Sequence, residues 1–110
     1  MLGALWSLEF ESILGDHGTG VVVLETDRLF GGDAQYFYIG NYKVRGCVLE
    51  ADVVVQHYAG PPFSIFGLTE IHKVILKGKI EVPVMKLQGH LANDPSQTFS
   101  IKCVKRADLP

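Results

Sequence analysis

Residues 47–56 read CVLEADVVVQ, and an apolar side chain recurs at every second position of this stretch. One face would carry Cys47, Leu49, Ala51, Val53 and Val55, and the other Val48, Glu50, Asp52, Val54 and Gln56. Successive side chains of a β-strand point to opposite sides, so a period of two predicts a strand with one buried and one mostly polar face. We expect this strand to be the longest in the chain.

The same alternation recurs on both sides of this strand. In the first of the flanking segments, for example, Trp6, Leu8 and Phe10 alternate with serine and glutamate residues. No segment shows a sustained period of 3.6 residues, so the helices that would have to connect parallel strands are missing from the pattern. Eight antiparallel strands are therefore predicted, at residues 3–12, 21–24, 29–30, 36–39, 47–56, 71–77, 85–91 and 99–103.

Turn-forming residues separate the predicted strands. Gly15–Gly18, Thr26–Arg28 and Asn93–Ser96 are typical of tight turns, because glycine reaches positive φ and aspartate bonds its own backbone. Gly60–Pro62 ends the strand at 47–56, and Phe63–Gly67 is the stretch in which we expect a helical turn that acts as a lid. Because the connections are short and hairpin-like, the sequence predicts an up-and-down barrel rather than a Greek-key sandwich.

Length and composition indicate one small folded domain, residues 1–110. With 47% hydrophobic and 20% charged residues, the chain lies far from the composition of disordered proteins. A net charge of −2 offers no attraction to phosphate backbones or anionic lipids, so neither nucleic acid nor a membrane is an expected partner. Glu9 and Glu11 interrupt the pattern of a secretion signal, which predicts a cytoplasmic protein. Cys47 and Cys103 lie in apolar runs and are expected to be buried and reduced.

The sequence contains no pattern typical of catalysis or metal binding. The spacing of the four histidines, His17, His57, His72 and His90, matches none of the zinc-binding motifs. Among them, His57 shares the apolar parity of its strand and is expected to be a hydrogen-bonded interior group. Neighbouring carboxylates fall on polar faces, where solvated side chains are expected rather than an acid–base pair. We therefore predict a protein that is not an enzyme and has no cofactor or metal.

The inner surface of the predicted barrel consists of the apolar strand faces. An eight-stranded barrel is just wide enough to be filled by its own side chains or to hold one small ligand, and the sequence leaves both open. Trp6 is expected to close one end. The residues expected to line the interior, and any ligand there, are Trp6, Leu8, Phe10, Leu49, Val53, Val55, His57, Leu76, Met85, Leu87, Phe99 and Ile101. Because this set contains no lysine or arginine, a neutral apolar molecule is favoured over a fatty acid.

Two of the predicted strands break the rule of one apolar face. Residues 21–24 are apolar at both parities, and residues 36–39 carry aromatic side chains at both. One set must point outward, and exposed aromatic area marks an interface more often than ordinary surface. We assign Val22, Tyr36 and Tyr38 to this outer surface and expect it to pack against a second copy of the chain, which gives a homodimer.

Five segments of the chain, in the same order, resemble the GrlR family of bacterial regulators. They are Gly3–Phe10 (GALWSLEF), Gly20–Leu24, Gly31–Asp33, Tyr38–Tyr42 and Ser64–Gly67. Together they run through most of the chain, and Gly31–Asp33 is the most distinctive. The resemblance implies a lipocalin-like eight-stranded barrel that dimerises. It also implies a negative regulator that binds a transcriptional activator of type III secretion genes rather than DNA.

The segment after the fourth predicted strand departs from that family, whose best-known member has an acidic Glu-Asp-Glu-Asp loop there. The loop in this chain is basic, and its residues Asn41, Tyr42, Lys43, Val44 and Arg45 are our candidate partner-binding loop. The family's own partner and contact therefore do not transfer. The first prediction is a regulatory protein that acts by protein–protein contact, and the alternative is a carrier or sensor of a small apolar ligand.

Overall fold

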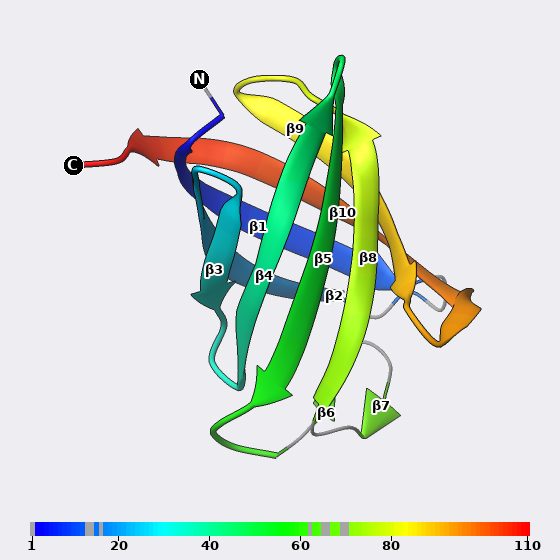
Figure 1. Cartoon of the computed structure of the whole chain (residues 1–110). Helices are drawn as coiled ribbons and strands as arrows, with labels where there is room; N and C mark the ends of the chain where they lie inside the picture. Colours follow the sequence, from blue (N-terminus) through cyan, green and yellow to red (C-terminus); the bar gives the residue numbers. More distant parts are fainter. Residues whose placement is uncertain (1, 13–14, 16, 62, 65–66, 69–70) are drawn as a thin grey trace.

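Eight long strands close into an antiparallel barrel in the computed structural model, which describes residues 2–12, 15, 17–61, 63–64, 67–68 and 71–110 (Figure 1). The barrel strands are β1 (Ala4–Ser12), β2 (His17–Glu25), β3 (Arg28–Gly32), β4 (Tyr36–Arg45), β5 (Val48–His57), β8 (Ile71–Lys79), β9 (Val84–Leu91) and β10 (Asp94–Asp108). Two short strands, β6 (Phe63–Ser64) and β7 (Gly67–Leu68), pair with each other between β5 and β8.

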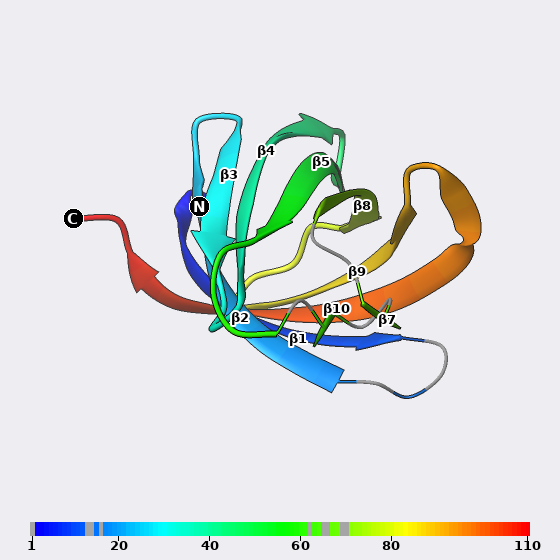
Figure 2. The ribbon, with the colours of Figure 1, turned by 90° about the horizontal axis from the view of Figure 1, so that it is seen from below.

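Around the barrel, the strand order is β1-β10-β9-β8-β5-β4-β3-β2, so consecutive long strands are neighbours. The β1–β10 pair closes the sheet, with Leu8 opposite Cys103. Figure 2 shows the strands wrapped around a common axis, viewed from the end at which β6 and β7 lie. The prediction of an all-β, eight-stranded, antiparallel up-and-down barrel is confirmed.

The two ends of the barrel differ. We call the end that holds the β1–β2, β3–β4 and β5–β8 connections the mouth end, and the opposite end the closed end. Because β1, β5 and β9 all begin at the closed end, the side chains early in these strands meet there. Trp6, Leu49 and Met85 occupy those positions and are the largest fully buried side chains of the described residues. The Trp6 indole Nε1–H donates a hydrogen bond to the Leu2 carbonyl (2.9 Å).

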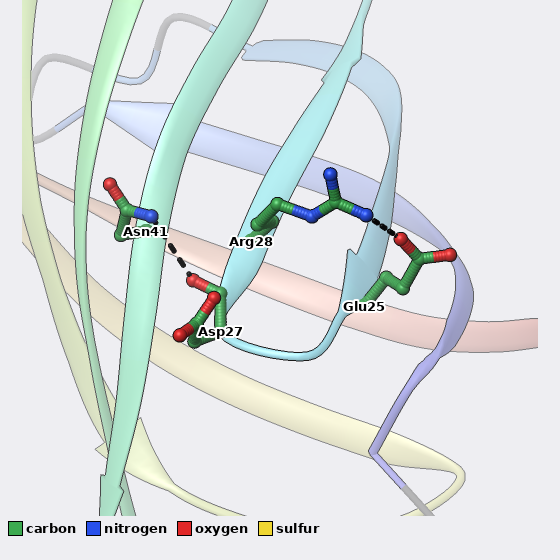
Figure 3. Close-up of polar contacts among 4 residues, drawn as sticks. All are labelled: Glu25, Asp27, Arg28 and Asn41. Carbon is green, nitrogen blue, oxygen red and sulfur yellow. Dashed lines mark hydrogen bonds and ion pairs between the residues drawn. The ribbon is translucent and has the colours of Figure 1, made fainter.

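The hairpin between β2 and β3 is fixed to β4 (Figure 3). Thr26 and Asp27 adopt positive φ angles of 42° and 64°, as required in the two-residue turns that suit twisted strands. The Asp27 carbonyl accepts the Tyr42 backbone N–H (2.9 Å) and the Asn41 side-chain amide (3.4 Å). Arg28 pairs with Glu25 on the far side of the turn. The turn is thus tied to the middle of β4.

The predicted partner-binding loop is therefore a strand. Asn41, Tyr42, Lys43, Val44 and Arg45 form the second half of β4, each opposite a residue of β5. The prediction of a loop is wrong because the sheet pairing continues to the turn at residues 46–47, where Gly46 has a positive φ of 62°.

Smaller predictions differ from the structure as well, and the longest strand is β10 with 15 residues rather than β5 with 10. Cys47 is exposed in that turn rather than buried, whereas Cys103 is buried as expected, and burial raises the pKa of its thiol to about 12. The last turn occupies residues 92–93 rather than Asn93–Ser96, since β10 already begins at Asp94. The helical turn and lid expected at Phe63–Gly67 fall partly on residues 65–66, which lie outside the described residues, and the described part is the β6–β7 pair.

Candidate ligand site inside the barrel

A cavity of about 610 Å³ lies inside the barrel. Apolar side chains from all eight long strands make most of its wall, including Trp6, Val22, Val53, Val74 and Met85. Its polar lining residues gather at the mouth end: His17, Thr19, Asp33, Gln35 and His72. Small-molecule sites in proteins have volumes of roughly 300–1,000 Å³ and combine an apolar wall with a few polar groups, so this cavity has the size and composition of a ligand site.

The structure places eleven of the twelve predicted lining residues in this wall: Trp6, Leu8, Phe10, Leu49, Val53, Val55, Leu76, Met85, Leu87, Phe99 and Ile101. The twelfth, His57, is not among the lining residues and lies at the mouth end of β5. His72 of β8 lines the cavity instead. It has the same parity in the sequence as Val74 and Leu76, and this alternation was the signal that could have identified it.

The assignment of Val22, Tyr36 and Tyr38 to the outer surface is wrong. Their side chains are 4%, 2% and 6% exposed, and all three line the cavity. The alternation in the sequence does not show which face of β2 or β4 points into the barrel, because the residues at both parities of 21–24 and 36–39 are apolar. For Tyr38, a glycine favours the inward direction of the side chain. A Cβ atom on Gly20 would lie 2.8 Å from the Tyr38 hydroxyl, so the missing side chain of Gly20 leaves space for the ring inside the barrel. The residues that do face outward include Val21 and Ile39.

Asp33 organises the mouth end of the cavity. Its Oδ1 accepts the backbone N–H groups of Gln35 (2.8 Å) and Tyr36 (2.7 Å), and its Oδ2 accepts the Tyr38 hydroxyl. The Tyr58 hydroxyl donates to the Asp33 backbone carbonyl (2.6 Å). Aspartate is favoured in such turns because its carboxylate reaches backbone donors two and three residues ahead. The same carboxylate therefore shapes the β3–β4 turn and holds Tyr38 in the cavity wall.

Burial controls the protonation of two further lining groups. It is the main cause that raises the pKa of the Tyr38 phenol, and the neighbouring Asp33 carboxylate adds to the effect. Burial also lowers the pKa of His72 below its usual value. Both shifts favour the neutral form of the side chain. At neutral pH the cavity thus presents an uncharged phenol, hydrogen-bonded to the Asp33 carboxylate, and an uncharged imidazole.

An aromatic ring, that of Tyr36, packs near His72. The Tyr36 ring lies between two imidazoles, with its centroid 6.0 Å from that of His72 and 5.6 Å from that of His57. The register of the sheet explains this group, because Tyr36 is opposite His57 in the β4–β5 pair and Val55 is opposite His72 in the β5–β8 pair. The wall can therefore contact a ligand through ring faces as well as through aliphatic groups.

The outer face of β4 presents a second arrangement of interest. Toward the mouth end it carries Ile39, which is 54% exposed. Toward the closed end, Lys43 Nζ and Arg45 Nε lie 3.9 Å and 3.8 Å from Glu50 Oε2, and Lys77 Nζ lies 3.8 Å from Glu50 Oε1. Three cations share one carboxylate, so this surface has a local excess of positive charge.

No protein-family model matches the sequence, and no curated protein matches it significantly. Within the described ranges, no three histidine, cysteine, aspartate or glutamate side chains are grouped so that they could hold a metal ion. The described part of the chain likewise has no helix long and apolar enough to cross a membrane. The barrel and its cavity are therefore the main basis for assigning a function.

Proposed function

We propose that this protein binds one small, largely apolar molecule inside the barrel, as a carrier or sensor. The observation that carries the proposal is the cavity of about 610 Å³ with its predominantly apolar wall. Transfer of apolar surface from water into such a wall is favourable by about 0.8 kcal/mol per buried CH₂ group. A ligand with a chain or ring system would thus gain most of its binding free energy from the wall.

The polar groups at the mouth end would orient the ligand. Gln35, Thr19 and His72 offer hydrogen-bonding atoms at that end, whereas the closed end around Trp6 and Leu49 is apolar. An amphipathic molecule would therefore enter with its apolar part first and keep its polar part near the mouth. This arrangement needs no chemical step, and the function is binding rather than catalysis.

Replacement of Val55 by tryptophan is expected to weaken binding strongly, because Val55 lines the cavity and the indole would occupy the ligand's space. Binding can be measured by the fluorescence of Nile red, a neutral apolar dye, and the affinity should fall at least about tenfold. Enlarging a side chain in a packed interior costs roughly 1–3 kcal/mol, and less where the side chain enters a cavity, so the variant should still fold.

Val54→Trp is the matched control, since the neighbouring side chain of β5 points away from the cavity and its residue pairs with Ile39 and Lys73. This variant should bind Nile red as the unmodified protein does. Equal dye binding by both variants, or no dye binding by the unmodified protein, would refute the proposal that the cavity is the binding site.

A second candidate function is regulation through protein–protein contact, in line with the resemblance to the GrlR family. The outer face of β4 supports it, because an exposed apolar position at Ile39 continues into the cations Lys43 and Arg45. A partner that fits this surface would present apolar side chains beside carboxylates. Both candidate functions belong to a cytoplasmic protein, as the sequence predicts.

Lys43→Glu tests the second candidate. Lys43 is exposed and its ion pair with Glu50 is long, so the substitution should change the free energy of unfolding by less than about 1 kcal/mol. Binding to a purified activator of type III secretion genes, the partner class that the resemblance implies, should weaken several-fold. Unchanged binding to that activator would show that the outer face of β4 is not the contact surface. Lys102→Glu, on the outer face of β10, serves as the control.

A further inference from the structure

We infer that the cavity selects ligands with a cationic amine head group, which the Asp33 carboxylate recognises at the mouth end. This inference rests on the proposed function, since it names the chemical class of the molecule that the cavity would bind. It also replaces the expectation of a neutral ligand with that of a cationic one. That expectation followed from the missing lysine and arginine, but it did not include Asp33, which lies outside the predicted strands.

The formal charges of the cavity lining favour a cation. Among the lining residues that the structure describes, Asp33 carries the only carboxylate, and none is a lysine or an arginine. Burial keeps His72 neutral, and the Tyr38 phenol donates to the Asp33 carboxylate without cancelling its charge. The wall of the cavity therefore holds one negative charge that is hydrogen-bonded by neutral donors.

Two basic side chains around the mouth, His17 and Arg106, contact groups other than the Asp33 carboxylate. His17 Nε2 at the rim lies 3.3 Å from Glu11 Oε2, so this imidazole contacts another carboxylate. Arg106 borders a shallow depression on the outside of β2 and β3 that Asp33 also borders, and it donates to the Ser7 hydroxyl (2.7 Å). None of the ion pairs found among the described residues joins Asp33 to a cation. A ligand ammonium group would supply that missing charge.

The hydrogen bonds of the Asp33 carboxylate leave one of its acceptor positions unused. Asp33 Oδ1 already accepts two backbone N–H groups and Oδ2 accepts one hydroxyl, but a carboxylate has about four acceptor positions. It can thus accept one more donor without breaking the turn. Tyr36, Tyr38 and Phe10 line the same end of the cavity, and aromatic rings attract cations at their faces. An ammonium group is therefore favoured there, and a carboxylate head group is repelled.

The test is a matched series of ligands with one chain and three head groups: octylamine, octanol and octanoate. At pH 7.5 the first is cationic, the second neutral and the third anionic. Dissociation constants can be measured by displacement of Nile red. We expect octylamine to bind at least about tenfold more tightly than octanol, and octanoate to bind most weakly, because hydrogen bonds to charged groups are the stronger ones.

Asp33→Asn keeps an oxygen for the two backbone N–H groups and removes the charge. In this variant the ratio of octylamine to octanol affinity should fall to about one. Asp52→Asn is the control, since Asp52 is exposed on the outer face of β5, and it should leave the ratio unchanged. The series on the unmodified protein needs no substitution, so the inference can be tested even where the Asp33 variant does not fold.

The outcomes separate the inference from the function on which it rests. If all three ligands bind equally, or octanoate binds best, the amine preference is wrong while ligand binding in the barrel stands. If none of the three binds and Nile red is not bound either, both proposals fail. A preference for octylamine that persists in Asp33→Asn would also overturn the role of this carboxylate.

Discussion

Leu49→Glu is expected to unfold the protein at neutral pH. Leu49 is fully buried at the closed end of the barrel, as are Trp6 and Met85. An ionised carboxylate at this position has no cation to pair with among the described cavity-lining residues. An uncompensated buried charge costs about 3–5 kcal/mol, which is comparable with the whole stability of about 5–15 kcal/mol of a small domain.

The free energy of unfolding of Leu49→Glu should depend on pH. Burial raises the pKa of a glutamate in the folded state above its unfolded value of about 4.3. The folded state then binds more protons than the unfolded state, so Leu49→Glu is least destabilised below about pH 4 and loses stability as the pH rises. Urea unfolding at several pH values measures this. Leu49→Gln, which does not titrate, is the reference, and the same pH profile for both variants would contradict the prediction.

Trp6→Ala is expected to lower the free energy of unfolding by about 3–5 kcal/mol. The substitution removes a fully buried indole together with its hydrogen bond to the Leu2 carbonyl, and it leaves a hole at the closed end. Because Trp6 is the only tryptophan, unfolding must be followed by far-ultraviolet circular dichroism rather than by tryptophan fluorescence. The urea midpoint should fall at an unchanged slope.

Trp6→Phe is the control for this variant. It keeps an aromatic ring at the closed end and loses mainly the hydrogen bond and part of the buried area, so its loss of stability should be clearly smaller. If alanine and phenylalanine destabilise the protein equally, the packing of the indole is not what closes the barrel. If alanine costs less than about 1 kcal/mol, Trp6 does not belong to the core.

The strands themselves were predictable because alternation is a local property. In 47–56 each side chain at one parity is apolar, and the structure buries Leu49, Ala51 and Val53 as that pattern requires. The ends of strands were less predictable, since pairing partners lie far away in the chain. The resemblance to the GrlR family placed a loop at residues 41–45, yet pairing with β5 extends β4 through them.

The candidate site was predictable only in its apolar part. Alternation identified lining residues such as Leu8, Phe99 and Ile101, because each has a polar neighbour on either side in the chain. It failed for Val22 and Tyr38, whose neighbours in the chain are apolar on both sides, and for Tyr36, which is followed by Phe37. It also could not show that Asp33, which lies outside the predicted strands, would bring its carboxylate to the wall of the cavity.

The sequence by itself determined that the chain forms antiparallel strands and that most of them have one apolar face, because a period of two depends only on the geometry of the extended backbone. The tertiary structure decided which face of β4 points inward and that the interior keeps a cavity of about 610 Å³. These features depend on register and on side-chain volumes summed across the barrel. Gly20 illustrates the reason: it makes room for Tyr38, a residue two strands away around the barrel that lies 18 positions later in the chain.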